Sequence, residues 1–105
     1  MKNKAINALI EMGMPADIKG FQYIADAMLM FENDAIRLGK TTSLYHEIGR
    51  KNNDTASCVE RAIRHAFGIV LANGNLEAVE KYLTLQNTKN GNLLHVLYLR
   101  LTQEE

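Results

Sequence analysis

The sequence predicts an all-α protein, a compact bundle of about six helices that contains a helix-turn-helix. Three observations support this fold class. The chain has a single proline, its β-branched and aromatic residues do not gather into alternating runs typical of strands, and Ala, Leu, Met, Glu, Lys and Arg dominate most segments. A chain of 105 residues has the usual size of one domain, so we expect residues 1–105 to form a single domain.

The first two helices are delimited by residues that end helices. One is predicted over about Asn3–Met12, because Gly13 followed by Pro15 is a typical helix end. Its inward residues are expected to be Ile6, Leu9 and Ile10. Apolar residues then recur with a helical period over Gly20–Leu38, which predicts a second helix with Gly39 as its stop. Asn33–Asp34 marks a candidate break within it.

A short third helix and a longer fourth one follow. Thr41 or Thr42 is expected to cap the third helix. Its inward positions are predicted to be Leu44, Tyr45 and Ile48. Turn-favouring residues at Asn52–Asp54 separate it from a helix over about Thr55–Asn73 that ends at Gly74.

Two more helices are predicted towards the C-terminus. Asn75 should cap a short one, and the segment Thr84–Gly91 is a polar loop. The inward residues of the short helix are expected to be Leu76, Val79 and Leu83. The tail Asn92–Leu101 is apolar nearly all round if it is helical, although Leu97–Leu101 also alternates like a strand. A lone strand would lack a partner, so we predict a tail helix.

Composition excludes several classes of protein. Lys plus Arg is 12 and Asp plus Glu is 12, so there is neither a strongly basic coat nor an acidic tail. No apolar run reaches the length of about 18 residues needed for a membrane span, and the N-terminus lacks a cleavable signal. We therefore expect a cytoplasmic protein. The single cysteine, Cys58, gives no zinc spacing with His46, His65 and His95. No metal, other cofactor or enzymatic activity is predicted.

Residues 42–73 have the parts of a helix-turn-helix. This motif needs two steeply crossing helices, a small residue at the crossing and apolar residues that lock the pair together. Ile48 and Val59 are the predicted lock, Gly49 is the small residue, and Asn53 lies in the turn.

The second helix of this motif has an outward arc suited to reading DNA. At 100° per residue, this arc contains Ser57, Glu60, Arg61, Arg64 and Gly68. Arginine can donate two hydrogen bonds to guanine, glutamate can accept one from cytosine, and serine can bond a phosphate. The plainer interpretation is that Glu60 and Arg64 form a surface ion pair. Charge favours DNA, because residues 37–65 have six cations and three anions, a local net charge of +3.

Several separated motifs resemble one protein family. The run TASCVERAIRH at Thr55–His65 resembles the recognition helix of the stage 0 sporulation protein A family, whose C-terminal effector domain binds DNA. Ile18–Tyr23 resembles the family's IKGY-x-Y stretch, and Met12–Ala16 resembles its IGVPA. Three further pairs are in register: Asn33-Asp34, Leu38-Gly39 and Gly74-Asn75. The resemblance covers about Ile6–Leu83, and the tail beyond it shows no obvious match.

The resemblance implies a six-helix domain that reads a TGTCGAA-type box in the major groove of double-stranded DNA. By position, Glu60 and Arg61 would contact bases and Arg64 a base or a phosphate, while Thr55 and Ser57 would contact the backbone. The full set of predicted DNA contacts is Lys51, Thr55, Ser57, Cys58, Glu60, Arg61, Arg64 and His65.

Two residues in this region depart from the family pattern. Cys58 stands where the family has arginine, and Asn52 where it usually has an apolar aromatic residue. The exchange at Cys58 removes a cation and its donors from the DNA-facing end of the helix.

Nothing in this chain fits the strand-rich receiver domain that precedes the effector domain in family members. The sequence therefore predicts a bacterial, nucleoid-associated effector domain without a receiver. An alternative is a protein-interaction module of the same fold with weakened DNA binding, acting on a full-length relative or on RNA polymerase. The apolar tail over residues 92–101 further predicts a homodimer contact. Its alternative is a tail that folds back over the first two helices of a monomer.

Overall fold

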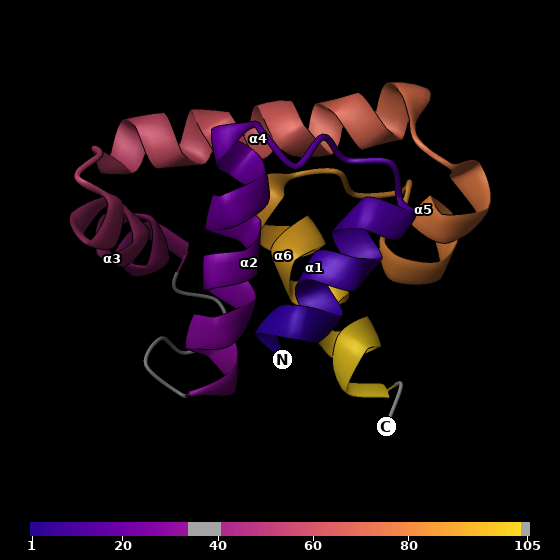
Figure 1. Ribbon diagram of the computed structural model, residues 1–105, viewed down its shortest axis with the longest axis horizontal. Helices are drawn as coiled ribbons and strands as arrows, with labels where there is room; N and C mark the ends of the chain where they lie inside the picture. The colour runs from indigo at the N-terminus through magenta and orange to yellow at the C-terminus, as the bar shows by residue number, and fades with distance from the viewer. Residues whose placement is uncertain (34–40, 104–105) are drawn as a thin grey trace.

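The computed structural model describes residues 1–33 and 41–103 and confirms the all-α class, with six helices and no strand in these two ranges (Figure 1). The helices are α1 (Lys2–Glu11), α2 (Lys19–Glu32), α3 (Thr41–Asn52), α4 (Ala56–Asn73), α5 (Leu76–Tyr82) and α6 (Asn90–Gln103). The predicted stop at Gly39 and the side chains of Thr41 and Thr42 lie outside what the structure describes. None of the described helices is long and apolar enough to cross a membrane.

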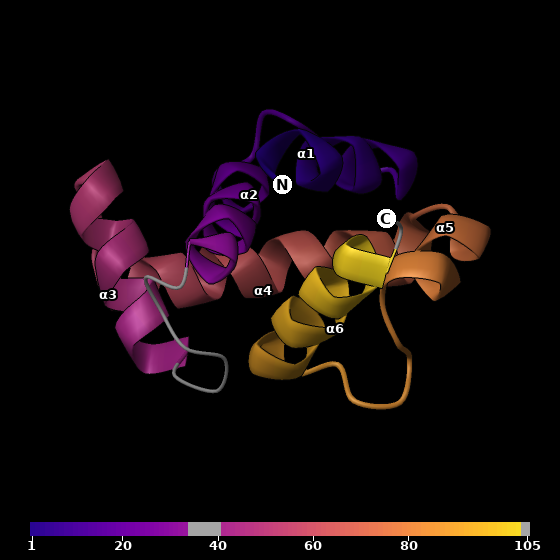
Figure 2. The same cartoon turned by 90° about the horizontal axis from the view of Figure 1, so that it is seen from below.

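The longest helix, α4, organises the molecule. It runs along one side of the bundle and α2 crosses it, while α3 lies at its N-terminal end and α5 at its C-terminal end (Figure 1). Figures 1 and 2 together show that α1 and α6 both lie on the side of α4 that faces the bundle, with α1 packed against α2 and α6 against α5. The N-terminal end of α4 thus lies beside α3 at one end of the molecule.

A glycine allows α2 and α4 to cross closely. A Cβ atom added at Gly20 would lie 2.3 Å from the carbonyl oxygen of Ala62 and 2.6 Å from the Cβ of Ala66. Any side chain at this position would therefore push the two helices apart. Helix α2 is buried on most of its surface, and its Ile24 and Met28 are fully buried in the core.

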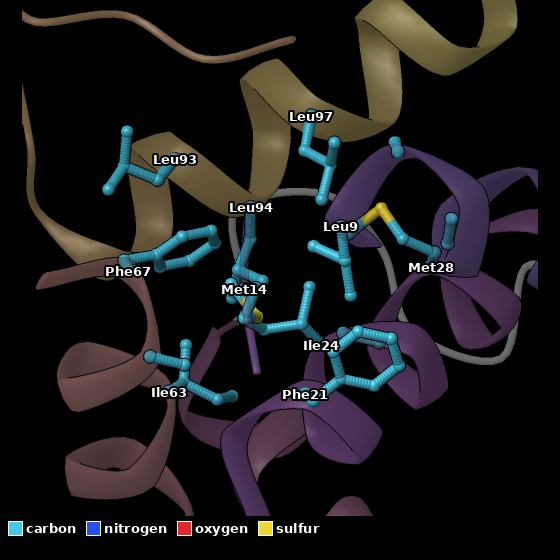
Figure 3. Packing of buried hydrophobic residues seen from close by; sticks show 14 of the residues in the cluster. Leu9, Met14, Phe21, Ile24, Met28, Ile63, Phe67, Leu93, Leu94 and Leu97 are labelled. Carbon is cyan, nitrogen blue, oxygen red and sulfur yellow. The ribbon is translucent and has the colours of Figure 1, made fainter. Parts of the chain in front are cut away.

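The tail helix is part of this core. Its four inward leucines are fully buried within the chain: Leu93, Leu94, Leu97 and Leu101. Of these, Leu93 and Leu94 lie beside Phe67 of α4, and Leu94 and Leu97 face the part of the core that contains Ile24 of α2 (Figure 3). The expectation that the tail has more apolar surface than the bundle can cover is therefore wrong, because α6 packs against α2, α4 and α5 at once. Leu99, which is 49% exposed, is the exception among its leucines.

Two predicted inward residues are exposed instead. Ile10 is 57% exposed and Leu76 is 62% exposed. On α1 the buried face is formed by Ala5, Ala8, Leu9 and Met12. This spacing of three and four residues places Ile10 on a different side of the helix. On α5 the buried residues are Ala78, Val79 and Tyr82. Helix α2 ends at Glu32 with Asn33 as its C-cap, in agreement with a break at Asn33, whereas Asp34 and the predicted continuation to Leu38 lie outside the described residues.

Candidate nucleic-acid interface

The turn between α3 and α4 is built on a close backbone contact. The backbone N–H of Asp54 donates a hydrogen bond of 2.8 Å to the carbonyl oxygen of Gly49. A Cβ atom at Gly49 would lie 2.5 Å from the carbonyl oxygen of Asp54, so only glycine fits here. Asn53 lies in the turn with φ at 56°, a left-handed conformation that asparagine tolerates better than most residues. Asn53 thus lies in the turn as predicted, and Gly49 is the small residue that permits the close approach.

Apolar residues hold the two helices of this pair together. Ile48 on α3 and Val59 and Ile63 on α4 are all fully buried. Their burial fixes the rotation of α4 about its axis, so the residues opposite them must face solvent. The α3–turn–α4 unit is consistent with the predicted helix-turn-helix.

Helix α2 is hydrogen-bonded to the turn that precedes α4. Tyr23 donates a hydrogen bond of 2.7 Å to Oδ2 of Asp54, and Oδ1 of Asp54 accepts one of 2.9 Å from the backbone N–H of Thr55. These two bonds, that from Tyr23 first, lower the pKa of Asp54 below its usual value. Burial, followed by the bond to Asp54, raises the pKa of Tyr23 to about 12. The negative charge of Asp54 is thus engaged within the protein.

The first turn of α4 is capped by a side chain. The Oγ1 atom of Thr55 accepts a hydrogen bond of 3.1 Å from the backbone N–H of Cys58. The hydroxyl proton of Thr55 still has a free direction in which to donate, for example to a phosphate. Ser57 is exposed on the same turn.

The outward arc of α4 is where the sequence places it. Ser57, Arg61, Arg64 and His65 are exposed, whereas Cys58 and Glu60 are half-buried. Arg64 lies 3.3 Å from Glu60, so the surface ion pair of the plainer interpretation is present, and 64% of the Arg64 side chain remains exposed. Nη2 of Arg61 lies 3.6 Å from Sγ of Cys58. The arc therefore presents two guanidinium groups one turn apart.

Lys51 is held apart from this arc. Its ammonium lies 3.4 Å from Oδ1 of Asp26, a fully buried carboxylate on α2. Asp26 also accepts hydrogen bonds from Gln22 and Asn52, at 2.9 and 3.2 Å. Sequence reasoning missed Asp26, although a carboxylate inside the apolar run around Ile24 is a visible signal. Asn52 thus has a structural role in the bundle, since it donates to this buried carboxylate.

Several cations of the predicted basic region are paired within the protein. Arg50 pairs with Glu47, and Lys51 with Asp26. Arg37 and Lys40 lie outside the described residues. Arg61, by contrast, contacts the sulfur of Cys58 and not a carboxylate. The local positive charge is therefore less available than its net value suggests, and it is concentrated on Arg61 and the exposed side of Arg64.

One further buried polar residue contacts the outward arc of α4. Asn90, the first residue of α6, is 9% exposed and contacts Glu60. Asn90 falls in the segment predicted to be a polar loop, and no local signal distinguishes it from the other asparagines there.

The chain was compared with models of known protein families. The family described as "Sporulation initiation factor Spo0A C terminal" matches residues 5–101. The match begins within α1 and continues through most of α6. The tail, for which the sequence shows no obvious resemblance beyond Leu83, thus falls within the matched region.

Proposed function

We propose, because this chain belongs to the family of Spo0A C-terminal domains of sporulation initiation factors, that it is a sequence-specific transcription regulator that reads a TGTCGAA-type box. The family is one of DNA-binding domains and not of enzymes. In the proposed complex, α3–turn–α4 acts as a helix-turn-helix, and the N-terminal half of α4 enters the major groove of double-stranded DNA.

Three side chains on the arc would read bases. Arg61 donates to O6 and N7 of a guanine, and Glu60 accepts from N4 of a cytosine. Arg64 contacts a base or a phosphate, depending on the depth at which the helix lies in the groove. The ion pair between Arg64 and Glu60, 3.3 Å long, would have to share its atoms with the DNA.

Other predicted contacts would be made with the sugar-phosphate backbone of the DNA. The hydroxyls of Thr55 and Ser57 lie at the N-terminal end of α4, where the helix dipole attracts phosphate. Lys51 and His65 would add sequence-independent phosphate contacts. Cys58 lies between Thr55 and Arg61 on the same end of the helix, and it is too short and too weakly polar to replace an arginine there.

The observation that carries the proposal is the solvent exposure of Arg61 and Arg64 on the face of α4 opposite Val59 and Ile63. A fixed helix with arginines one turn apart on its free side matches the geometry of major-groove readout. The first experiment is a mobility-shift titration of a TGTCGAA duplex and a scrambled duplex at two salt concentrations. Tighter binding of the specific duplex at both concentrations supports the proposal, and equal binding contradicts it.

Two observations favour the alternative, a protein-interaction module with weakened DNA binding. Cys58 occupies an arginine position, and the ammonium of Lys51 is already paired with Asp26. Such a module would act on a full-length relative or on RNA polymerase. Equal, weak binding of both duplexes would favour this function. Under either function we place the protein with the nucleoid in a bacterial cytoplasm.

The apolar residues of the tail no longer support a homodimer contact through residues 92–101, because the inward leucines of α6 are buried within the chain. What supports it now is the half-exposed Leu99 alone. We therefore propose a monomer in the absence of DNA.

A further inference from the structure

We propose that Asn90 of α6 is a specificity-determining positioning residue, which holds the carboxylate of Glu60 in the orientation that reads cytosine. This inference rests on the proposed function. It assigns to the start of the tail helix, 30 residues beyond Glu60 in the chain, a part in base readout without contact with DNA.

Asn90 anchors α6 to the middle of the recognition helix. Its Nδ2 atom donates a hydrogen bond of 2.9 Å to the carbonyl oxygen of Glu60 and lies 3.3 Å from Oε2 of the same residue. Asn90 itself is 9% exposed. Because it bonds both the backbone and the carboxylate of one residue, Asn90 fixes the side chain relative to the helix that carries it.

The geometry leaves one carboxylate oxygen of Glu60 available. Arg64 approaches Oε2 at 3.3 Å, and Asn90 approaches this same oxygen. Both described partners thus contact Oε2 rather than Oε1. A carboxylate held by one oxygen can offer the other to the N4 amino group of cytosine. Fixing a flexible glutamate before binding also reduces the rotamer entropy lost on contact.

A third helix meets at this point. The pKa of Tyr45 on α3 is raised, chiefly by burial, while a hydrogen bond with Asn90 lowers it, and the charges of Glu60 and Arg64 act on it in opposite directions. The Tyr45 phenol therefore lies beside the same group. The carboxylate of Glu60 is thus contacted by Asn90 and Arg64, with Tyr45 close to the same group.

The test compares Asn90→Ala with a matched control, Asn92→Ala. Asn92 also lies in the first turn of α6. Its Nδ2, however, donates a hydrogen bond of 2.9 Å to the carbonyl oxygen of Asn87, in the loop that precedes α6. Glu60→Ala first identifies the base pair whose preference depends on Glu60. At that pair, Asn90→Ala should reduce the preference for C·G about fivefold, whereas Asn92→Ala should leave it unchanged. Preference at the pair read by Arg61 should persist in both variants.

A double-mutant cycle separates positioning from a general effect. In the Glu60→Ala background, adding Asn90→Ala should cause no further loss of preference at that pair. Asn90→Asp, which keeps the size of the side chain but cannot donate and repels Glu60, serves as a second variant. Circular dichroism of each variant shows whether the helical fold is retained.

The outcomes distinguish the two proposals. If wild type and Glu60→Ala have the same base preferences, the proposed reading of DNA through Glu60 fails. If Glu60→Ala changes the preference but folded Asn90→Ala and Asn90→Asp do not, the role of Asn90 is overturned. A measurement that needs no Asn90 variant is the side-chain amide resonance of Asn90. The specific duplex should shift this resonance more than the scrambled one, and equal shifts would also contradict the inference.

Discussion

The hydroxyl of Tyr23 donates a hydrogen bond of 2.7 Å to the carboxylate of Asp54 and so ties α2 to the turn between α3 and α4. The other oxygen of Asp54 accepts from the N–H of Thr55, the N-cap residue of α4. A residue outside the α3–turn–α4 unit thus helps to set the position of α4. Fixing this helix before DNA arrives reduces the ordering that binding would otherwise require.

Tyr23→Phe should lower the melting temperature by a few degrees at neutral pH, because it removes the bond to Asp54 while keeping the ring. Thermal unfolding followed by circular dichroism measures this change. Lys19→Ala is the control, since the Lys19 ammonium is 3.9 Å from Asp54 on a side chain that is 76% exposed. An effect of Lys19→Ala as large as that of Tyr23→Phe would show that net charge, and not this hydrogen bond, stabilises the turn.

The stabilisation from this pair should depend on pH at both ends of the range. The pKa of Asp54 lies below its usual 3.8 in the folded protein. Its contribution is therefore present above pH 3.8 and is lost as the pH falls through the lowered value. The pKa of Tyr23 is raised from 10.0 to about 12. Its contribution is present below pH 10 and is lost as the pH rises towards 12. Urea unfolding of wild type and Tyr23→Phe should thus differ most near neutral pH.

Arg61→Ala should cost about 1–3 kcal/mol of specific DNA binding and relax the preference at one G·C pair. The reason is that an exposed guanidinium on the free face of α4 would be lost. Binding to single-base variants of the TGTCGAA duplex measures the effect. An unchanged base preference would remove Arg61, and with it α4, from the recognition surface.

Lys51→Ala should weaken binding to all duplexes alike and lower the slope of log affinity against log salt by about 1, as expected for one lost phosphate contact. The pairing of Lys51 with the buried Asp26 provides a competing outcome. A slope equal to that of wild type, with lower stability, would mean that Asp26 keeps the ammonium away from DNA.

Cys58→Arg should tighten DNA binding, because it adds a cation to the first turn of α4, where the side chain is half-buried beside exposed Ser57 and Arg61. Cys58→Ser is the control that removes the thiol without adding charge. A fluorescence-anisotropy titration at constant salt compares the three proteins. Equal affinities of Cys58→Arg and Cys58→Ser would show that this end of the helix does not approach DNA.

The leucines of α6 should differ sharply in their effect on stability. Leu97→Ala should lower the free energy of unfolding by about 2–5 kcal/mol, because it leaves a cavity at a fully buried position. Leu99→Ala, at a side chain that is 49% exposed, should change it by less than about 0.5 kcal/mol. For a monomer, these values should be the same at all protein concentrations. A melting temperature that rises with concentration would instead support the homodimer contact.

The sequence by itself determined the elements of this protein and the face of α4 that is free. Periodicity, caps and glycines predict the ends of α4 to within a residue, and the positions of Gly49, Asn53 and Val59 identify the helix pair. These features are encoded locally, because a helix repeats every 3.6 residues and a turn needs particular residue types. For the same reason the arc with Arg61 and Arg64 could be assigned without coordinates.

Only the tertiary structure decided which residues of other helices contact α4 and the turn before it. The bond from Tyr23 to Asp54, the pairing of Lys51 with Asp26 and the contact of Asn90 with Glu60 join residues 31, 25 and 30 positions apart. A sequence pattern specifies which side of a helix is apolar but not which helix covers it. The exposed Ile10 and the buried tail leucines show this limit. Burial depends on how several helices pack together, and that packing is a property of the whole chain.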